Sequence, residues 1–256
     1  MNSETLSTII QHLDRELRAE DFPDDSAHNG LQVENSGTVR KVCCGVDASL
    51  DFFEKAKSAG ADLCIVHHGL SWGTSLARIT DLNYRLIRYL LENDLALYAS
   101  HLPLDAHPTL GNNAVLAGAL GLRSLEPFGL YHGMRIGMRG MLPRALSPEA
   151  FQVRLANVAP GGNLVAMLHG PDRIRSVGVV SGGGADELPQ AVAAGLDAFV
   201  SGEGGLQAYN QARQSGIHAF FAGHYATETF GVKALGTLIR ETFGLPSEFI
   251  DFRLPY

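Results

Sequence analysis

The sequence contains few cysteines. Only three occur among its 256 residues, Cys43, Cys44 and Cys64, and all lie inside apolar runs. An odd count without a spacing pattern excludes a disulfide framework and fits a reducing compartment. Free cysteine in an apolar run is typical of a buried strand. We therefore expect three buried thiols and a cytoplasmic location.

Long apolar runs are also absent, since no stretch approaches the roughly 18–20 residues that a membrane span needs. Residues 1–14 carry Glu4 and Asp14 among spaced apolar residues. This stretch lacks the basic region and apolar run of a secretory signal. We expect neither a membrane partner nor secretion.

Positive charge is scarce, because 20 Lys and Arg residues face 27 Asp and Glu residues, a net charge of −7. Without a basic run, the chain lacks the electrostatic footprint of a duplex-binding protein. Bulk nucleic acid is therefore not expected as a partner, whereas a small anionic substrate at a local cationic site is compatible. Charged residues make up 18% and hydrophobic residues 45% of the chain, which excludes general disorder.

Apolar runs alternate with helical patterns over the first half of the chain. Strands are predicted at 39–46, 63–66 and 95–99, and helices at 47–58 and 81–93. This alternation is typical of a parallel sheet covered by helices, so the predicted fold class is α/β.

The central segment carries a further strand–helix–strand pattern. Residues 135–142 and 164–168 are predicted strands, and residues 147–157 are a predicted helix between them. Ser147 and Pro148 form a good helix start, because serine caps the first turn and proline suits the first helical position.

The alternating pattern occurs twice. Residues 42–69 align without gaps on 177–204 with seven identities in 28 positions, against about two by chance. Residues 97–101 similarly match 220–224, and each copy has a carboxylate four residues after its histidine. Shared packing rules explain matching Ala, Gly and Val, but not this histidine and carboxylate. We predict an internal duplication that forms two βαβ lobes with mainly parallel sheets. The expected division is residues 1–125 plus 218–256 for the first lobe and 126–217 for the second.

Ionisable residues follow four of the predicted strands. They are His67-His68, His101 with Asp105, Glu203, and His224 with Glu228. Ligands of open parallel sheets collect at the carboxyl ends of the strands, so this clustering is the strongest functional signal.

Each of these features also has a simpler explanation. Adjacent His67 and His68 could be one buried and one solvated histidine. Glu228 lies one helical turn after His224 and could merely complement a helix amino terminus. Asp105 could cap a turn, because Pro103 disfavours a regular helix from His101. Trp72 is predicted to pack rather than to stack on a base.

Taken together, imidazoles and carboxylates are the ligand types of Zn, Mn, Fe, Co or Ni. The absence of cysteine disfavours a closed structural zinc site. More than four candidate ligands favour two divalent metal ions, which would lie about 3.5–4 Å apart, lower the pKa of a water and hold a substrate oxygen.

Several motifs resemble those of the Nif-three-like family, the dinuclear-metal proteins known as GTP cyclohydrolase I type 2 homologs. The matching segments are Asn29-Gly30-Leu31-Gln32, Gly45-Val46-Asp47, Val66-His67-His68-Gly69-Leu70, Ser100-His101-Leu102-Pro103-Leu104-Asp105, Gly111-Asn112-Asn113, Ser201-Gly202-Glu203 and Gly223-His224-Tyr225-Ala226-Thr227-Glu228. They cover nearly the whole chain in family order, which resembles the short form without an inserted domain.

The resemblance implies a toroidal homohexamer with its sites facing an interior cavity, and GTP ring opening as the activity. It also implies a metal pair with Glu228 as the bridge, held by His67, His68, Asp105, His224 and Glu228. Glu203 stands where the family often has Asp.

Two functional hypotheses remain open. The first is a hydrolase for a nucleotide or another small phosphorylated or cyclic amidine substrate. In it, Glu228 or Glu203 handles a proton and His101 orients the substrate. Whether His101 and Glu203 are ligands, outer-sphere groups or substrate-binding groups stays open. The second is a non-catalytic metal-binding oligomer that handles metal or binds a partner. Single-stranded nucleic acid inside a ring is disfavoured by the acidic charge.

A glycine-rich segment, Ser181-Gly182-Gly183-Gly184, follows a predicted strand. It could cradle a phosphate, but it lacks the lysine and hydroxyl residue of a P-loop. A tight turn between strand and helix is therefore the favoured interpretation.

Overall fold

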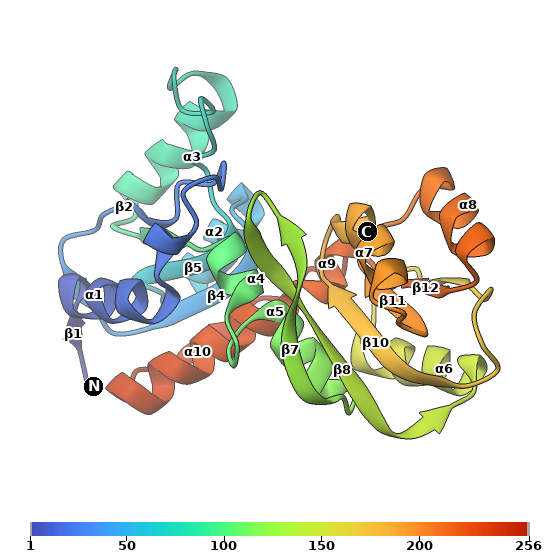
Figure 1. The fold of residues 1–256 in the computed structure, drawn as a ribbon. Helices are drawn as coiled ribbons and strands as arrows, with labels where there is room; N and C mark the ends of the chain where they lie inside the picture. The colour runs from blue at the N-terminus through green and yellow to red at the C-terminus, as the bar shows by residue number, and fades with distance from the viewer. Residues whose placement is uncertain (1, 255–256) are drawn as a thin grey trace. The chain divides into compact units, whose positions relative to one another are not determined.

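The computed structural model describes residues 2–254, and the contacts within the chain divide it into two compact units (Figure 1). The first unit comprises the chain up to Leu104 together with Gly231–Asp251. The second comprises Asp105–Phe230 together with the segment that starts at Phe252. None of the described helices combines the length and the apolarity needed to cross a bilayer.

A five-stranded sheet forms the centre of the first unit (Figure 1). Its spatial order is β13 (Ser247–Phe249), β4 (Val42–Asp47), β5 (Leu63–His68), β6 (Ala96–Ala99) and β2 (Gly30–Val33). The first four strands are parallel, and β2 pairs antiparallel with β6. The remaining elements are β1 (Glu4–Thr5), α1 (Leu6–Leu17), η1 (Ala19–Asp21), β3 (Thr38–Val39), α2 (Leu50–Ser58), α3 (Asp81–Glu92) and most of α10 (Thr229–Phe243).

Strands β4 and β5 are buried along their length and end in polar residues at the carboxyl edge of this sheet. Every residue of both strands except the last is buried. Helix α2 is capped by Ser49, whose hydroxyl accepts from the Phe52 amide, and it buries Phe52 against Gly45. A side chain at position 45 would overlap the Phe52 ring, so this contact requires glycine. Asp47 and His68, the last residues of the two strands, are therefore partly exposed polar groups next to an apolar core.

Distant parts of the sequence lie side by side in the first unit. The His12 ring of α1 meets the Phe243 ring at the end of α10, with centroids 5.3 Å apart.

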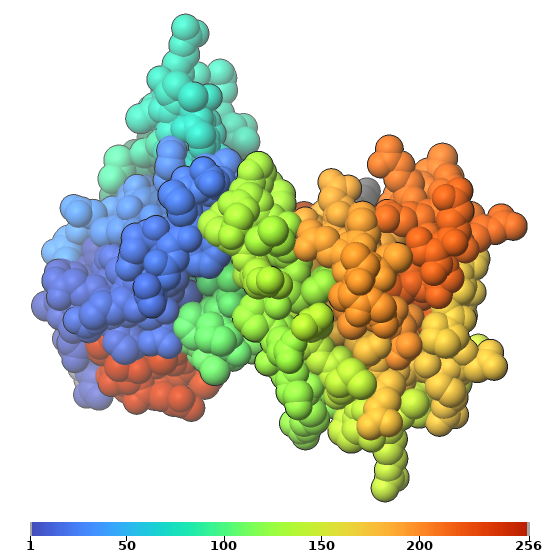
Figure 2. Space-filling view, viewed as in Figure 1, coloured from blue at the N-terminus to red at the C-terminus, as the bar shows by residue number. Residues whose placement is uncertain are grey.

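The segment after β5 that leads into α3 projects from the body of this unit, as the teal region of Figure 2 shows.

A six-stranded mixed sheet forms the centre of the second unit. Its spatial order is β7 (Arg123–Tyr131), β8 (Met134–Leu146), β10 (Ile174–Val180), β11 (Ala198–Ser201), β12 (His218–Phe221) and β9 (Val165–Met167). Strands β10, β11 and β12 are parallel, and the other pairings are antiparallel. The helices are α5 (Asn112–Ala119), α6 (Pro148–Val158), η2 (Gly184–Glu187), α7 (Leu188–Ala193), α8 (Leu206–Ser215) and α9 (His224–Thr227), and α4 (Leu102–Ala106) contains the unit boundary.

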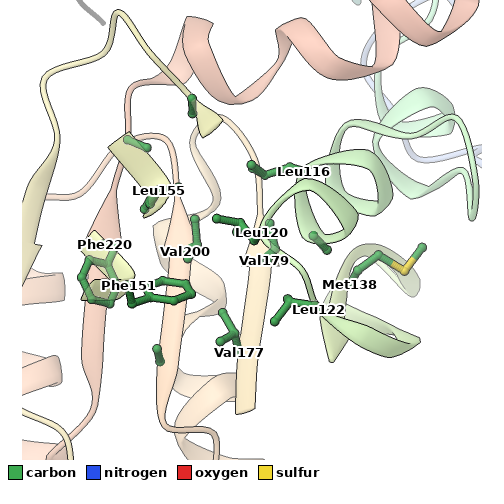
Figure 3. Packing of buried hydrophobic residues seen from close by; sticks show 14 of the residues in the cluster. Leu116, Leu120, Leu122, Met138, Phe151, Leu155, Val177, Val179, Val200 and Phe220 are labelled. Carbon is green, nitrogen blue, oxygen red and sulfur yellow. The ribbon is translucent and has the colours of Figure 1, made fainter. Parts of the chain in front are cut away.

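The core of the second unit packs between this sheet and helices α5 and α6 (Figure 3). The Phe151 and Phe220 rings lie 5.1 Å apart, and both side chains are fully buried. Ser147 caps α6 by accepting from the Ala150 amide, and Pro148 occupies the first helical position. The helix start predicted from these two residues is therefore confirmed.

The α/β fold class is confirmed, because each unit contains a run of parallel strands connected by helices. The second sheet is less parallel than expected, since β7, β8 and β9 run antiparallel to their neighbours. The division of the chain also differs from the expected one. Residues 105–125 and 218–230 belong to the second unit, because α5 packs on β8 and β10, and β12 pairs with β11.

Strand register partly matches the repeat seen in the sequence. Val42 pairs with Leu63 and Val177 pairs with Ala198, so both strands keep the offset of 135 residues. In the third strand, Ile65 pairs with Tyr98 and Val200 with Phe220, which is an offset of 122. The sequence match has an offset of 123, so the strands that lead to His101 and His224 differ by one residue in register. The internal duplication stays a prediction.

Candidate metal centre

His67 and His68 end β5 at the carboxyl edge of the first sheet. The fully buried His67 ring donates from Nδ1 to the Ser100 carbonyl at 2.8 Å. His68 Nδ1 lies 2.8 Å from Asp47 Oδ1, and Asp47 is its partner in the register of β4 and β5. Parallel pairing thus brings together two residues that are 21 positions apart.

His101 follows β6 and is held from two sides. Its backbone amide donates to Asn29 Oδ1 at 2.7 Å, and its Nδ1 lies 2.9 Å from Asp25 Oδ1. The Asp25 side chain is only 1% exposed and also accepts from Ala27, Asn29 and Leu102. Burial works to raise the pKa of Asp25, but the hydrogen bond and charge of His101 outweigh it, so the pKa lies below its ordinary value.

These three imidazoles form one cluster within the first unit. Ring centroids lie 4.7 Å apart for His67 and His68, 5.1 Å for His67 and His101, and 5.7 Å for His68 and His101. Their candidate ligand atoms all lie within 4.8 Å of one another. Outer hydrogen bonds to Nδ1 are the usual support of metal-binding histidines, because they fix the ring and its tautomer.

His224 occupies a different electrostatic setting in the second unit. Its Nδ1 lies 2.8 Å from Glu203 Oε1, and its Nε2 lies 3.1 Å from Glu228 Oε1. Glu228 is buried, with 4% of its side chain exposed, whereas Glu203 is 57% exposed. Glu228 first, and then Glu203, raise the pKa of His224 to about 9 against the opposing effect of burial. A divalent metal that replaced this proton would find an imidazole and a carboxylate already paired.

Asp105 belongs to the second unit and is held beside a glycine turn. Its Oδ1 accepts from Asn112 Nδ2 at 2.9 Å and from Ser181 Oγ at 3.1 Å. The next residue, Gly182, has φ +61°, and a side chain there would collide with the Glu228 carboxylate. The segment after β10 is therefore a tight turn, as favoured from the sequence, and its glycine makes room for a carboxylate.

The predicted residues thus fall into two sets. His67, His68 and His101 cluster in the first unit, and Glu203, His224 and Glu228 cluster in the second. Asp105 approaches the second set through Ser181 and Gly182. Imidazoles supported at Nδ1, together with buried carboxylates, fit the donor preferences of Zn, Mn, Fe, Co and Ni.

Sequence reasoning missed the outer partners, Asp25, Asp47, Asn112 and Ser181. Asp47 had a usable signal, because it ends the strand next to β5. Asp25 had none, since it lies in an aperiodic loop 76 residues from His101. Trp72 lies beside two of these histidines, and its role in packing rather than base stacking stays a prediction. Its ring lies 4.8 Å from the His101 ring and 5.8 Å from the His68 ring, and its Nε1 donates to the Gly69 carbonyl.

This combination of an α/β fold and histidine-rich strand ends defines a candidate metal-binding α/β protein. The chain belongs to the Duf34/NIF3 (NGG1p interacting factor 3) family, whose model matches residues 4–254. A relative from Deinococcus radiodurans, named GTP cyclohydrolase 1 type 2 homolog, is 42% identical over 246 residues, which cover 95% of this chain and 92% of the relative.

Solved structures show the same fold over nearly the whole chain. The protein ybgI, described as of unknown function, has a TM-score of 0.91 and 34% identity, with coverage of 99% of this chain and 100% of the other. TTHA1606 from Thermus thermophilus has a TM-score of 0.89 and 39% identity, with coverage of 97% and 98%.

Proposed function

We propose that this protein is a metal-dependent hydrolase acting on a nucleotide or a related small phosphorylated or cyclic substrate. The observation that carries the proposal is the support of four histidines at Nδ1 by a carbonyl or a carboxylate. The name shared by its curated relatives, GTP cyclohydrolase 1 type 2 homolog, favours a purine nucleotide as the first substrate to test.

The proposed ligands of two divalent metal ions are His67, His68, Asp105, His224 and Glu228. Bound metal of this kind lowers the pKa of a water and polarises a substrate oxygen. It would also supply positive charge for an anionic substrate inside a protein of net charge −7. As part of the same proposal, the protein assembles as a homohexamer in the cytoplasm.

The two carboxylates that contact His224 are proposed to manage protons in the reaction. Buried Glu228 faces Nε2 of this histidine, and the more exposed Glu203 holds Nδ1. In the proposal, Glu228 accepts or returns a proton at its carboxylate, while Glu203 keeps the imidazole oriented. His101, which lies beside His67 and His68, either contacts the substrate or binds metal.

Metal analysis of untagged protein by mass spectrometry is the first test, because it examines the ligand set directly. Protein reloaded with Mn²⁺ or Zn²⁺ is then screened for hydrolysis of GTP and other nucleotides. Glu228→Gln should abolish turnover, and the exposed Glu241→Gln on α10 is the matched control. Activity that survives Glu228→Gln would indicate contamination and contradict the proposal. Bound metal without turnover would favour the non-catalytic, metal-handling alternative.

A further inference from the structure

An open pocket in the second unit is lined by residues that have no part in the proposed metal chemistry. It lies between the segments that follow β10 and β11, and it is bordered by α7 and α8, which lie side by side (Figure 1). Asp186 and Pro189 line it from the first segment, and Leu206, Gln207 and Gln211 line it from the second. Its volume of about 680 Å³ is within the usual range of ligand sites, roughly 300–1,000 Å³. The pocket is therefore large enough for a nucleobase with its ribose.

The same two segments hold His224. They are joined where they begin, because the Gly182 carbonyl accepts from the amides of Gly202 and Glu203 at 2.9 and 3.0 Å. The Glu203 carboxylate contacts His224 Nδ1, and Gly205 in the wall of the pocket follows two residues later. Ligands of open α/β sheets bind outside the carboxyl ends of the strands, which is where these segments start. A molecule in the pocket is therefore held by the loops that also position the second set of candidate ligands.

Three polar side chains at this pocket have no hydrogen-bond partner among residues 2–254. They are the Asp186 carboxylate and the amides of Gln207 and Gln211. The two glutamines lie one turn apart on α8, so they share a face of the helix. In contrast, the Gln190 amide both donates to and accepts from the Leu130 backbone, which is a structural role. The pocket therefore offers a ligand one charged acceptor and two amides.

Apolar contact is available beside these polar groups. Leu206 is 76% exposed, more than any other large apolar residue between positions 2 and 254, and Pro189 is exposed as well. Covering such side chains with a flat ring removes apolar surface from water and stabilises binding. Apolar walls with a few placed polar groups are the usual composition of a small-molecule site.

We propose that this pocket binds the base of a guanine nucleotide, and that Asp186 determines the preference for guanine. The inference rests on the proposed function, because it specifies the base of the proposed substrate. Guanine presents two adjacent donors, N1–H and the exocyclic amine, and a carboxylate can accept from both. Adenine has no proton on N1, so this atom would face the carboxylate as a second acceptor. The Gln207 and Gln211 amides can donate to the O6 and N7 acceptors of guanine.

The test measures binding of GDP, inosine diphosphate and ADP to the full chain by equilibrium dialysis, both metal-free and loaded with Zn²⁺. All three ligands carry the same phosphates, so differences in affinity report the base. Inosine differs from guanosine only by lacking the exocyclic amine. We expect GDP to bind about tenfold tighter than either competitor, since a bidentate contact with a base discriminates by about this factor or more. Equal affinities, or no binding of GDP, would overturn the proposal.

Asp186→Asn gives a positive result that does not depend on loss of binding. Xanthine has a carbonyl oxygen where guanine has its amine, and an asparagine amide can donate to that oxygen while its carbonyl accepts from N1–H. We expect the affinity for GDP to fall about tenfold and xanthosine diphosphate to become the tighter ligand, the reverse of the order in the parent. Asp172→Asn, at an exposed position between β9 and β10, is the matched control and should keep the parent order. An unchanged order in Asp186→Asn would contradict the role of Asp186.

Turnover assays separate this inference from the proposed function. If no nucleotide is hydrolysed but Asp186→Asn exchanges guanine preference for xanthine preference, the base site stands and the hydrolase fails. If GTP, ITP and ATP are hydrolysed at equal rates and Asp186→Asn changes nothing, the hydrolase stands and the base site fails. Glu228→Gln should abolish turnover without changing the order of base affinities, because Glu228 is not among the residues that line the pocket.

Discussion

The two units hold their histidines in contrasting ways. In the first unit, three imidazoles cluster and each is supported at Nδ1 by a carbonyl or carboxylate. In the second, one imidazole lies between Glu203 and Glu228. The first set therefore presents several imidazole rings, each held in place at Nδ1, to a cation. The second is an ion pair in which a metal must replace a proton, so the two sets should respond differently to substitution and to pH.

The largest expected effect is the loss of the second set by Glu228→Gln. This change removes a buried carboxylate that faces His224. We expect the Zn²⁺ affinity of the site that contains Glu228 to fall by about 100-fold or more, because direct ligands matter more than outer partners. Isothermal titration with Zn²⁺ measures the change, and Glu241→Gln is the control. Parent-like affinity in Glu228→Gln would remove the distinction between the two sets.

Gly182→Ala should lower both the stability of the protein and its metal binding by the second set, because it strains the backbone next to Glu228. Position 182 has φ +61°, and the added methyl would meet the Glu228 carboxylate. We expect the free energy of unfolding to fall by about 1–3 kcal/mol, together with weaker metal binding. Gly183→Ala is the matched control, because φ there is −80° and only His224 Cε1 lies near, at 3.9 Å. Urea denaturation of both variants measures the difference, and equal stabilities would contradict the explanation.

The stability of the metal-free protein should depend on pH through the second set. Glu228 and Glu203 raise the pKa of His224 to about 9, from an ordinary value near 6.5. A raised folded-state pKa stabilises the metal-free protein fully below about pH 6.5, and this contribution is lost as pH rises through 9. Urea unfolding at pH 6, 7.5 and 9 should show the decline, and Glu228→Gln should flatten it. A decline of the same size in Glu228→Gln would assign it to other groups.

Asp47→Asn tests the support of the first set. It keeps the shape of the side chain but weakens the acceptor for His68 Nδ1. We expect the affinity for Co²⁺ to fall by about tenfold, with little change in stability. Quenching of the fluorescence of Trp72, whose ring lies 5.8 Å from the His68 ring, measures this affinity. Asp51→Asn, an exposed position in the first turn of α2, is the control. An unaffected Asp47→Asn titration would mean that strand register alone orients His68.

The smallest effect is expected at a helix cap remote from the histidines in sequence. Ser147→Ala removes the acceptor for the Ala150 amide and should cost about 1 kcal/mol of stability. Metal binding to either set should be unchanged. A melting curve and a metal titration check the two halves of this prediction, and Ser3→Ala, at an exposed position, serves as the control.

Elements with a strong local pattern could be predicted from the sequence. The apolar runs ending at His67-His68 and before His101 became β5 and β6, and the Ser147 cap began α6. The unit boundaries could not, because the place of α5 depends on its packing against β8 and β10. For Ser181 the sequence suggested a tight turn or a phosphate cradle, and no contact with Asp105. Its hydroxyl contacts Asp105 because folding brings together positions 76 residues apart.

By itself, the sequence determined where the main strands lie to within a few residues and that histidines and carboxylates stand near their ends, because apolar periodicity and residue chemistry are local properties. Only the tertiary structure decided which of these side chains meet. Strand pairing put Asp47 beside His68, and an aperiodic loop brought Asp25 to His101. It also offset the third strands by one residue from the sequence repeat, because register depends on hydrogen bonding and packing across a whole sheet.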